Sequence, residues 1–144
     1  MYLVTAEQMR QADRMTIQEL GMPEMVLMEN AGKAVVEFLQ ETFTDLTEKA
    51  ITLVAGAGNN GGDALVAARY LHLLGVPVKV FIYADRELSP SAKQNYEILS
   101  RLPVKMYWLD SENSMHLLKV TVNYSDIFID GLLGTGVNRD VSGQ

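Results

Sequence analysis

Two glycine-containing segments carry the side chains that could do chemistry. The first, at residues 56–71, reads GAGNNGGDALVAARYL, and the second, at residues 130–140, reads DGLLGTGVNRD. Gly56, Gly58 and Gly61 match the G-x-G-x-x-G spacing of loops that hold the pyrophosphate of a dinucleotide. The first segment therefore raises the question of whether it binds a phosphate or serves another chemistry.

Asp63 argues against an ordinary pyrophosphate site. Free amides and the helix dipole favour negative charge at a helix N-terminus, and Asp63 already supplies that charge there. Two like charges about 4 Å apart repel by roughly 1 kcal/mol in water and about 4 kcal/mol near a protein surface. One point still favours a dinucleotide site, because Asp85 ends the next predicted strand, where an acid would bind a ribose. The plainer interpretation is that Asp63 caps its helix.

The asparagines and Asp130 open a second possibility, a cation site. Asn59 and Asn60 taken alone favour a plain turn. Asp130 ends the apolar strand DIFID, where it either caps the next turn or serves a site. If the two segments meet, Asn60 and Asp130 offer one neutral and one anionic oxygen, which are ligands that hard cations prefer. One carboxylate among neutral oxygens suits a monovalent ion better than a divalent one.

An alternation of strands and helices from residue 50 onward must position these segments. Apolar runs predict strands, and periodic segments with Gly75 as one stop and Ser89-Pro90 as one start predict helices. The predicted strands are 51–54, 76–85, 104–110 and 125–136, and the predicted helices are 63–75, 89–102 and 111–121. This order indicates βαβ units, a parallel sheet and helices on both faces. Both glycine segments then lie at the carboxyl-terminal rim of the sheet, where such folds bind ligands.

Two helices are predicted before the sheet. Thr5 and Gln8 match a capping box, and the first helix should run to about Leu20 and stop at Gly21. The second helix covers residues 23–43, and its Ala31-Gly32 pair would let another backbone approach closely. The apolar residues of these helices exceed one narrow stripe, which makes a homodimer through them possible.

Composition excludes several classes of protein. The 144 residues fit one domain. The net charge of −6 disfavours nucleic acid and anionic membranes as partners. The absence of cysteine excludes disulfides, cysteine-ligated zinc and cysteine nucleophiles. With neither a secretory leader nor an apolar run long enough for a membrane span, the sequence predicts a soluble, cytoplasmic protein.

The two glycine segments together resemble the YjeF N-terminal domain family, the NAD(P)H-hydrate epimerases, and the helical start EQMRQADRMTIQELGMPEMVLMENAG resembles that family's N-terminal helices. The resemblance runs over nearly the whole chain and implies a Rossmann-like three-layer α/β/α fold with a mainly parallel sheet behind two N-terminal helices. It implies a single domain over residues 1–144 that interconverts the R and S forms of NADHX and NADPHX. In those molecules water has added to the nicotinamide ring, and a fused or separate dehydratase partner restores NAD(P)H.

The resemblance also implies roles for individual residues. Asn60 and Asp130 would bind a potassium ion. From the chemistry of the reaction itself, we expect Asp130 to be catalytic, with Asp63 as its helper. Residues that contact the substrate would be Asn59, Asn60, Gly61, Gly62, Asp63, Gly134, Thr135, Gly136, Val137, Asn138, Arg139 and Asp140.

Two departures from the family pattern lead to further expectations. Ala64 stands where the family has glycine, and its methyl group should narrow the approach of a ligand to the backbone. The family continues into a further strand, an aspartate and a proline-serine-glycine turn, which lie beyond Gln144. We therefore expect a truncated domain with an exposed sheet edge, which would be incomplete as a catalyst.

Two other classes of function stay open at this point. One is a non-catalytic Rossmann-like ligand-binding or scaffold domain, which would have no need of Asn60, Asp63 and Asp130. The other is an ordinary NAD-dependent dehydrogenase domain, against which Asp63 counts. For an epimerase, the hydroxyl would leave to give an iminium-like cation and water would return to the other face, which requires a proton donor and a stabilising negative charge.

Overall fold

The structure is a computed structural model, and it describes residues 3–134. The chain forms the helices α1 (Ala6–Gln18), α2 (Glu24–Thr42), α3 (Asn59–Leu73), α4 (Pro90–Leu99) and α5 (Glu112–Asn123), and a short 3₁₀ turn at Leu46–Glu48. Its strands are β1 (Ile51–Ala55), β2 (Val78–Ile82), β3 (Lys105–Trp108) and β4 (Ile127–Gly131). The predicted alternation of strands and helices is confirmed.

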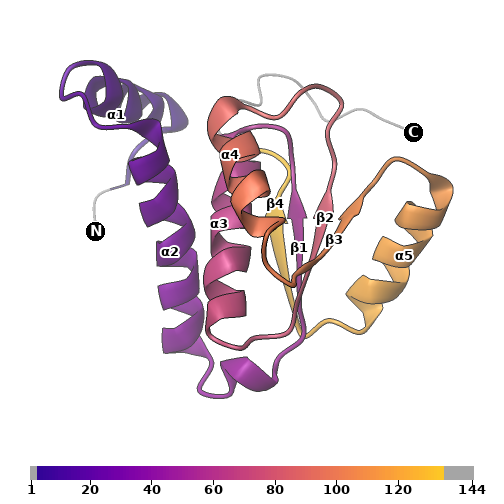
Figure 1. Ribbon diagram of the computed structural model, residues 1–144. Coiled ribbons are helices and arrows are strands. Elements are labelled where there is room, and N and C mark those ends of the chain that lie inside the picture. The colour runs from indigo at the N-terminus through magenta and orange to yellow at the C-terminus, as the bar shows by residue number, and fades with distance from the viewer. Residues whose placement is uncertain (1–2, 135–144) are drawn as a thin grey trace.

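All four strands are parallel and lie in the order β3-β2-β1-β4. The helices α2, α3 and α4 lie on one side of this sheet and α5 lies on the other (Figure 1). The arrangement is the predicted three-layer Rossmann-like fold. Because β1 is flanked by β2 and β4, its carboxyl end is next to the carboxyl ends of both, and Val54 is paired with Asp130 across the β1–β4 ladder.

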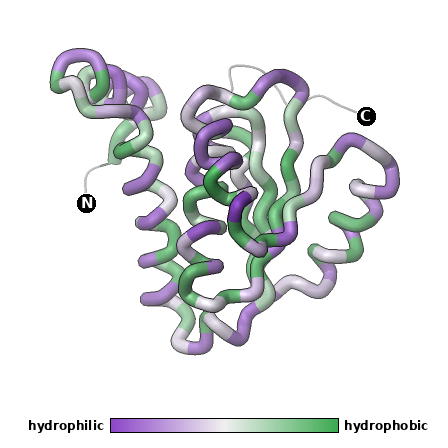
Figure 2. Tube along the Cα trace, in the orientation of Figure 1, coloured by the Kyte–Doolittle hydropathy of each residue, from purple (hydrophilic) through white to green (hydrophobic). Residues whose placement is uncertain are grey.

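The core lies between the sheet and the helices α2, α3 and α4. The five residues of β1 are all buried, as expected for a central parallel strand. Leu53, Leu65, Leu71 and Leu99 are fully buried and belong to one hydrophobic cluster. Figure 2 shows the strands as predominantly hydrophobic, whereas the trace of α2 alternates between hydrophobic and hydrophilic residues. This alternation is the pattern of a helix that buries one face.

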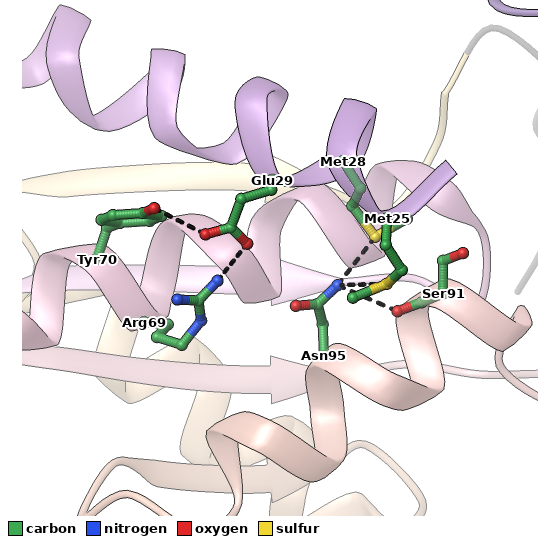
Figure 3. A network of polar contacts seen from close by, with 7 residues as sticks. All are labelled: Met25, Met28, Glu29, Arg69, Tyr70, Ser91 and Asn95. Carbon is green, nitrogen blue, oxygen red and sulfur yellow. Dashed lines mark hydrogen bonds and ion pairs between the residues drawn. The ribbon is translucent and has the colours of Figure 1, made fainter. Parts of the chain in front are cut away.

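Polar contacts fasten α2 to α3 and α4 (Figure 3). Glu29 of α2 pairs with Arg69 of α3 and accepts a hydrogen bond of 2.7 Å from the Tyr70 hydroxyl. Asn95 of α4 is buried, and its amide donates to the sulfur of Met28 at 3.1 Å and to the Ser91 carbonyl at 3.1 Å. These contacts fix the spacing of the three helices whose N-termini point toward the carboxyl ends of the strands.

Several local predictions are confirmed. The Thr5–Gln8 capping box is present, with the Gln8 amide 3.2 Å from the Thr5 hydroxyl oxygen. Gly21 and Gly75 end their helices with φ of 70° and 80°, a conformation that favours glycine. Ser89 caps α4 ahead of Pro90. No helix within residues 3–134 is long and apolar enough to cross a lipid bilayer.

Candidate functional site

The first glycine segment enters α3 earlier than the sequence predicts. The N-cap of α3 is Gly58, so Asn59 and Asn60 form the first helical turn and Asp63 lies inside the helix. The interpretation of the two asparagines as a plain turn is therefore wrong, and so is the interpretation of Asp63 as the helix cap. Gly58 has no side chain with which to cap the helix.

Glycine is required inside this segment because the chain folds tightly on itself. A Cβ atom at Gly61 would lie 1.9 Å from the Gly56 carbonyl oxygen, and one at Gly56 would lie 2.4 Å from the Leu132 carbonyl oxygen. Both distances are far below van der Waals contact, and both atoms that would be met are backbone. Gly61 therefore closes the loop after β1, and Gly56 lets the second segment approach.

The two glycine segments meet at the carboxyl-terminal rim of the sheet, as predicted. The Gly56 amide donates to the Gly131 carbonyl at 3.0 Å. The Asn60 side-chain amide donates to the Leu133 carbonyl at 2.9 Å. These bonds join residues that are more than seventy positions apart in sequence, and they bring Asn60 against the segment that follows Asp130.

Asp130 lies at this rim with an exposed side chain. Its Oδ1 accepts a hydrogen bond of 2.9 Å from the Leu132 amide, so the carboxylate does cap the turn after β4. Within residues 3–134 no other donor contacts it. Its second oxygen is therefore available to a ligand, and so is Asn60 Oδ1, because the hydrogen bond to Leu133 engages only the amide nitrogen.

Asn59 is engaged in a network that joins three helix N-termini. Its amide nitrogen donates to Glu24 at 2.6 Å, and its amide oxygen accepts from the Ser89 hydroxyl at 2.9 Å. The second Glu24 oxygen accepts from the Ser91 hydroxyl at 2.6 Å. Sequence reasoning assigned Asn59 to substrate and missed Glu24, Ser89 and Ser91 as its partners. The one signal available was Ser89-Pro90, which marks the start of α4.

Asp63 is half-buried and lies near the acids of α1 and α2. Within residues 3–134 no hydrogen-bond donor or cation contacts its carboxylate. Burial, together with the nearby negative charges of Asp13 and Glu24, raises the pKa of Asp63 to about 6. The group can therefore hold or release a proton near neutral pH.

The structure does not bring Asp63 together with Asp130. The next residue, Ala64, packs against β4, where its Cβ lies 2.6 Å from the position of a Cβ at Gly131. Consecutive residues of a helix point about 100° apart, so Asp63 projects away from β4. The expectation that the Ala64 methyl narrows the approach of a ligand is also wrong, because that methyl belongs to the hydrophobic core.

Of the other predicted substrate residues, Gly62 and Gly134 lie within the described range and six lie outside it. A Cβ at Gly62 would lie 2.5 Å from the end of Met28 and 3.3 Å from Ala92, so this glycine serves the packing of α2, α3 and α4. Gly134 lies beside Asn60, whose Cβ is 3.1 Å from the position of a Cβ at Gly134. Outside the described residues are Thr135, Gly136, Val137, Asn138, Arg139 and Asp140.

A cavity of about 320 Å³ lies at the other end of the sheet, where the strands begin. Its walls come from the start of β1, β2 and β3 and from the end of α5, and they include Lys79, Lys105 and Tyr124. None of the predicted site residues lines it. The predicted site residues and this cavity therefore lie at different ends of the sheet, and the predicted residues lie at the end where parallel sheets bind their ligands.

The fold and the two joined glycine segments define a Rossmann-like domain with a candidate site between the ends of β1 and β4. Residues 24–144 match the model of one family, described as YjeF-related protein N-terminus, and the chain belongs to this family. The predicted family is thereby confirmed.

The chain is similar to proteins with related names. It is 41% identical over 138 residues to a bifunctional NAD(P)H-hydrate repair enzyme of Moorella thermoacetica, covering 94% of this chain and 26% of that protein. It is 33% identical over 141 residues to an NAD(P)H-hydrate epimerase of Limosilactobacillus reuteri, covering 98% of this chain and 62% of that protein. The crystal structure of the yeast protein YNL200c matches with a TM-score of 0.83 and 27% identity, covering 99% of this chain and 60% of that one.

Proposed function

We propose that this chain is the epimerase domain of an NAD(P)H-hydrate repair enzyme, which interconverts the R and S forms of NADHX and NADPHX. The observation that carries the proposal is the meeting of the two glycine segments, which sets Asn60 and Asp130 at one rim of the sheet. The names of the relatives in Moorella and Limosilactobacillus support the substrate class. The bifunctional relatives support a dehydratase as the partner activity, either fused or separate.

The reaction inverts the carbon that carries both the hydroxyl and the ring nitrogen. A proton reaches the hydroxyl, the C–O bond breaks with loss of water, and the nitrogen lone pair forms an iminium-like cation. Water then adds to the opposite face and releases a proton. The Asp130 carboxylate is assigned to the cation, because negative charge near a developing positive centre stabilises it. Asp63 projects toward the acids of α1 and α2 and is therefore assigned a helper's role only, as a group that can hold a proton near neutral pH.

A potassium ion fits the residues at the rim. Asp130 keeps one carboxylate oxygen and Asn60 keeps its amide oxygen free of hydrogen-bond donors from residues 3–134, and both are hard oxygen ligands. A bound monovalent cation would supply positive charge that offsets the acids near the substrate. Gly134 and the residues outside the described range complete the proposed substrate segment.

Two further parts of the proposal concern the state of the protein. We infer a homodimer through α1 and α2, because α1 buries none of its residues in the chain itself. A cytoplasmic location fits the substrate class and the absence of cysteine.

The proposed function is tested by following R/S exchange of NADHX by chromatography, above the spontaneous rate. Asp130→Asn should reduce the catalysed exchange by at least about a hundredfold, within the range known for loss of one electrostatic contact in a transition state. Because Asp130 is exposed, the variant should unfold at the same urea concentration as the parent.

Asp110→Asn is the matched control, because Asp110 is also exposed and follows a strand but lies at the end of β3. It should exchange at the parental rate. Equal exchange in the parent and in Asp130→Asn would refute the assigned role. Potassium should accelerate the parent more than lithium does, and it should lose this advantage in Asp130→Asn.

A further inference from the structure

A Cβ atom at Gly58 would have more open space around it than one at any other described glycine of the two glycine segments. At Gly56, Gly61 and Gly131 a Cβ atom would meet protein atoms at 2.6 Å or less, so protein fills those positions. At Gly58 the nearest atom is Arg86 Nη2, 4.0 Å away. The space over Gly58 is therefore open, and a guanidinium group stands at its edge.

The backbone holds Arg86 in this position. The segment after β2 is bonded at one end to β1, because the Tyr83 amide donates to the Ala55 carbonyl at 2.9 Å, and at the other end to the first glycine segment, because the Ser89 amide donates to the Ala57 carbonyl at 2.8 Å. Arg86 lies between these two anchors. Its side chain is exposed, and within residues 3–134 it has no ion pair or hydrogen bond.

Charges of both signs lie along the rim. Asp63 faces Asp13 and Glu24 on the side of α1 and α2, and Asp130 lies at the end of β4. Arg86 lies at the end of β2, across β1 from Asp130. A dinucleotide carries its negative charges on its phosphates, away from the nicotinamide ring. With the ring near Asp130, the phosphates reach toward β2, where the guanidinium group of Arg86, between Asp85 and Glu87 in the sequence, stands beside the open space over Gly58.

We propose that Gly58 and Arg86 form a phosphate subsite of the substrate site, an assignment that rests on the proposed function. The absent side chain of Gly58 gives the phosphate access to the backbone, and the guanidinium group binds two phosphate oxygens through parallel hydrogen bonds. Two phosphates of the substrate class have this chemistry, the pyrophosphate and, in NADPHX, the 2′-phosphate. An arginine that follows the second strand is one way in which Rossmann-like sites hold a 2′-phosphate.

The test is calorimetric titration of the chain with adenosine, AMP, ADP and 2′,5′-ADP. Arg86→Gln should weaken binding of a phosphate-bearing probe by about tenfold or more and should leave adenosine unchanged. A loss that is largest for ADP assigns the pyrophosphate, and a loss confined to 2′,5′-ADP assigns the 2′-phosphate. Gly58→Ala should weaken the same probe, and the extended backbone at Gly58 (φ −92°, ψ −169°) accommodates alanine.

Arg101→Gln is the matched control, because Arg101 is an exposed arginine that follows α4 at the amino-terminal end of the strands, far from the rim. It should bind every probe as the parent does, and melting temperatures should show that all variants are folded. The subsite is overturned if the parent binds none of the phosphates. It is also overturned if Arg86→Gln changes their affinity by less than about twofold or weakens adenosine equally.

The two proposals fail in different ways. If phosphate binding depends on Arg86 but the intact protein catalyses no R/S exchange, the epimerase function fails and the subsite stands. If exchange occurs and Arg86→Gln leaves the KM of both NADHX and NADPHX unchanged, the subsite fails and the function stands.

Discussion

Burial, together with the nearby charges of Asp13 and Glu24, raises the pKa of Asp63. Asp13 comes from α1, Glu24 from the start of α2 and Asp63 from α3, so the cluster exists only in the folded chain. Glu24 also has a structural task, since its carboxylate accepts hydrogen bonds from Asn59 and Ser91. Repulsion within the cluster acts mainly on Asp63, because its carboxylate has no hydrogen-bond donor among the described residues.

The buried and repelled charge of Asp63 predicts that Asp63→Asn stabilises the fold in a pH-dependent way. Folding raises the pKa of Asp63 from an ordinary value of 3.8 to about 6. The carboxyl is therefore neutral in both states below about pH 4, and its destabilising effect grows between pH 4 and pH 6 and is fully present above pH 6. At pH 8 the variant should be more stable by about 1 kcal/mol, after allowance for solvent screening, and at pH 4 the gain should vanish.

Urea denaturation at the two pH values provides the measurement. Asp110→Asn, an exposed acid at the end of β3, should show no such difference between pH 4 and pH 8. A gain for Asp63→Asn that is equally large at pH 4 would mean that charge is not its cause.

At the residue scale the sequence predicted contacts that follow from strand direction. Asn60 follows β1 and Asp130 lies near the end of β4, so the rule that the carboxyl ends of parallel strands share a rim was enough to predict that both lie at one rim. The role of Asn59 could not be predicted in this way. Its partners Glu24 and Ser89 belong to two other helices, and their meeting depends on how those helices pack rather than on any local pattern.

At the scale of elements, the start of α3 shows where local preference fails. Two glycines in the first turn oppose helix formation by roughly 1 kcal/mol each relative to alanine, so sequence reasoning began the helix at Asp63. Packing overrides this preference. Gly61 fits against Gly56 within the loop, and Gly62 fits against Met28 of α2. The predicted close approach at Gly32 is confirmed, because a Cβ there would lie 2.5 Å from Val66 of α3.

The contact between α3 and β4 depends on the close packing of the Ala64 methyl group against Gly131. Gly131→Ala would place its new Cβ 2.6 Å from the Ala64 Cβ and 3.0 Å from the Val54 carbonyl oxygen. Overpacking of this kind costs about 1 to 3 kcal/mol. Ala64→Gly removes the main obstacle, so the double variant should be more stable than the sum of the two single losses predicts, by about 1 kcal/mol.

The coupling can be measured from the four urea midpoints of this mutant cycle. Gly134→Ala is a useful comparison at the same rim, because its new Cβ would lie 3.1 Å from Asn60 rather than from Ala64. Its effect should not change when Ala64 is replaced. Strictly additive losses for Gly131→Ala and Ala64→Gly would contradict the pairing.

At the scale of the whole molecule, the N-terminal helices expose large apolar side chains to solvent. Met9 of α1 is 44% exposed and Phe38 of α2 is 63% exposed. In Figure 1, α1 lies away from the sheet. A 13-residue helix is marginal in water without packing partners, and a second copy of the chain would supply them.

Light scattering of the purified chain should therefore give twice the monomer mass of 16.0 kDa. Phe38→Ser should shift the mass toward the monomer without loss of helical circular dichroism. Tyr124→Ser is the control, because Tyr124 is an aromatic residue that is 81% exposed but lies at the end of α5, on the other side of the sheet. A monomeric parent, or equal dissociation by both substitutions, would rule out α2 as the interface.

The bonds from Gly56 to Gly131 and from Asn60 to Leu133 also bear on how the protein is made. A ribosome has already released the first glycine segment when β4 is still being synthesised. The proposed binding rim therefore cannot form from the early part of the chain, and contacts of such long sequence separation are slow to close. Ligand affinity should consequently be among the last native properties to be acquired during synthesis or refolding.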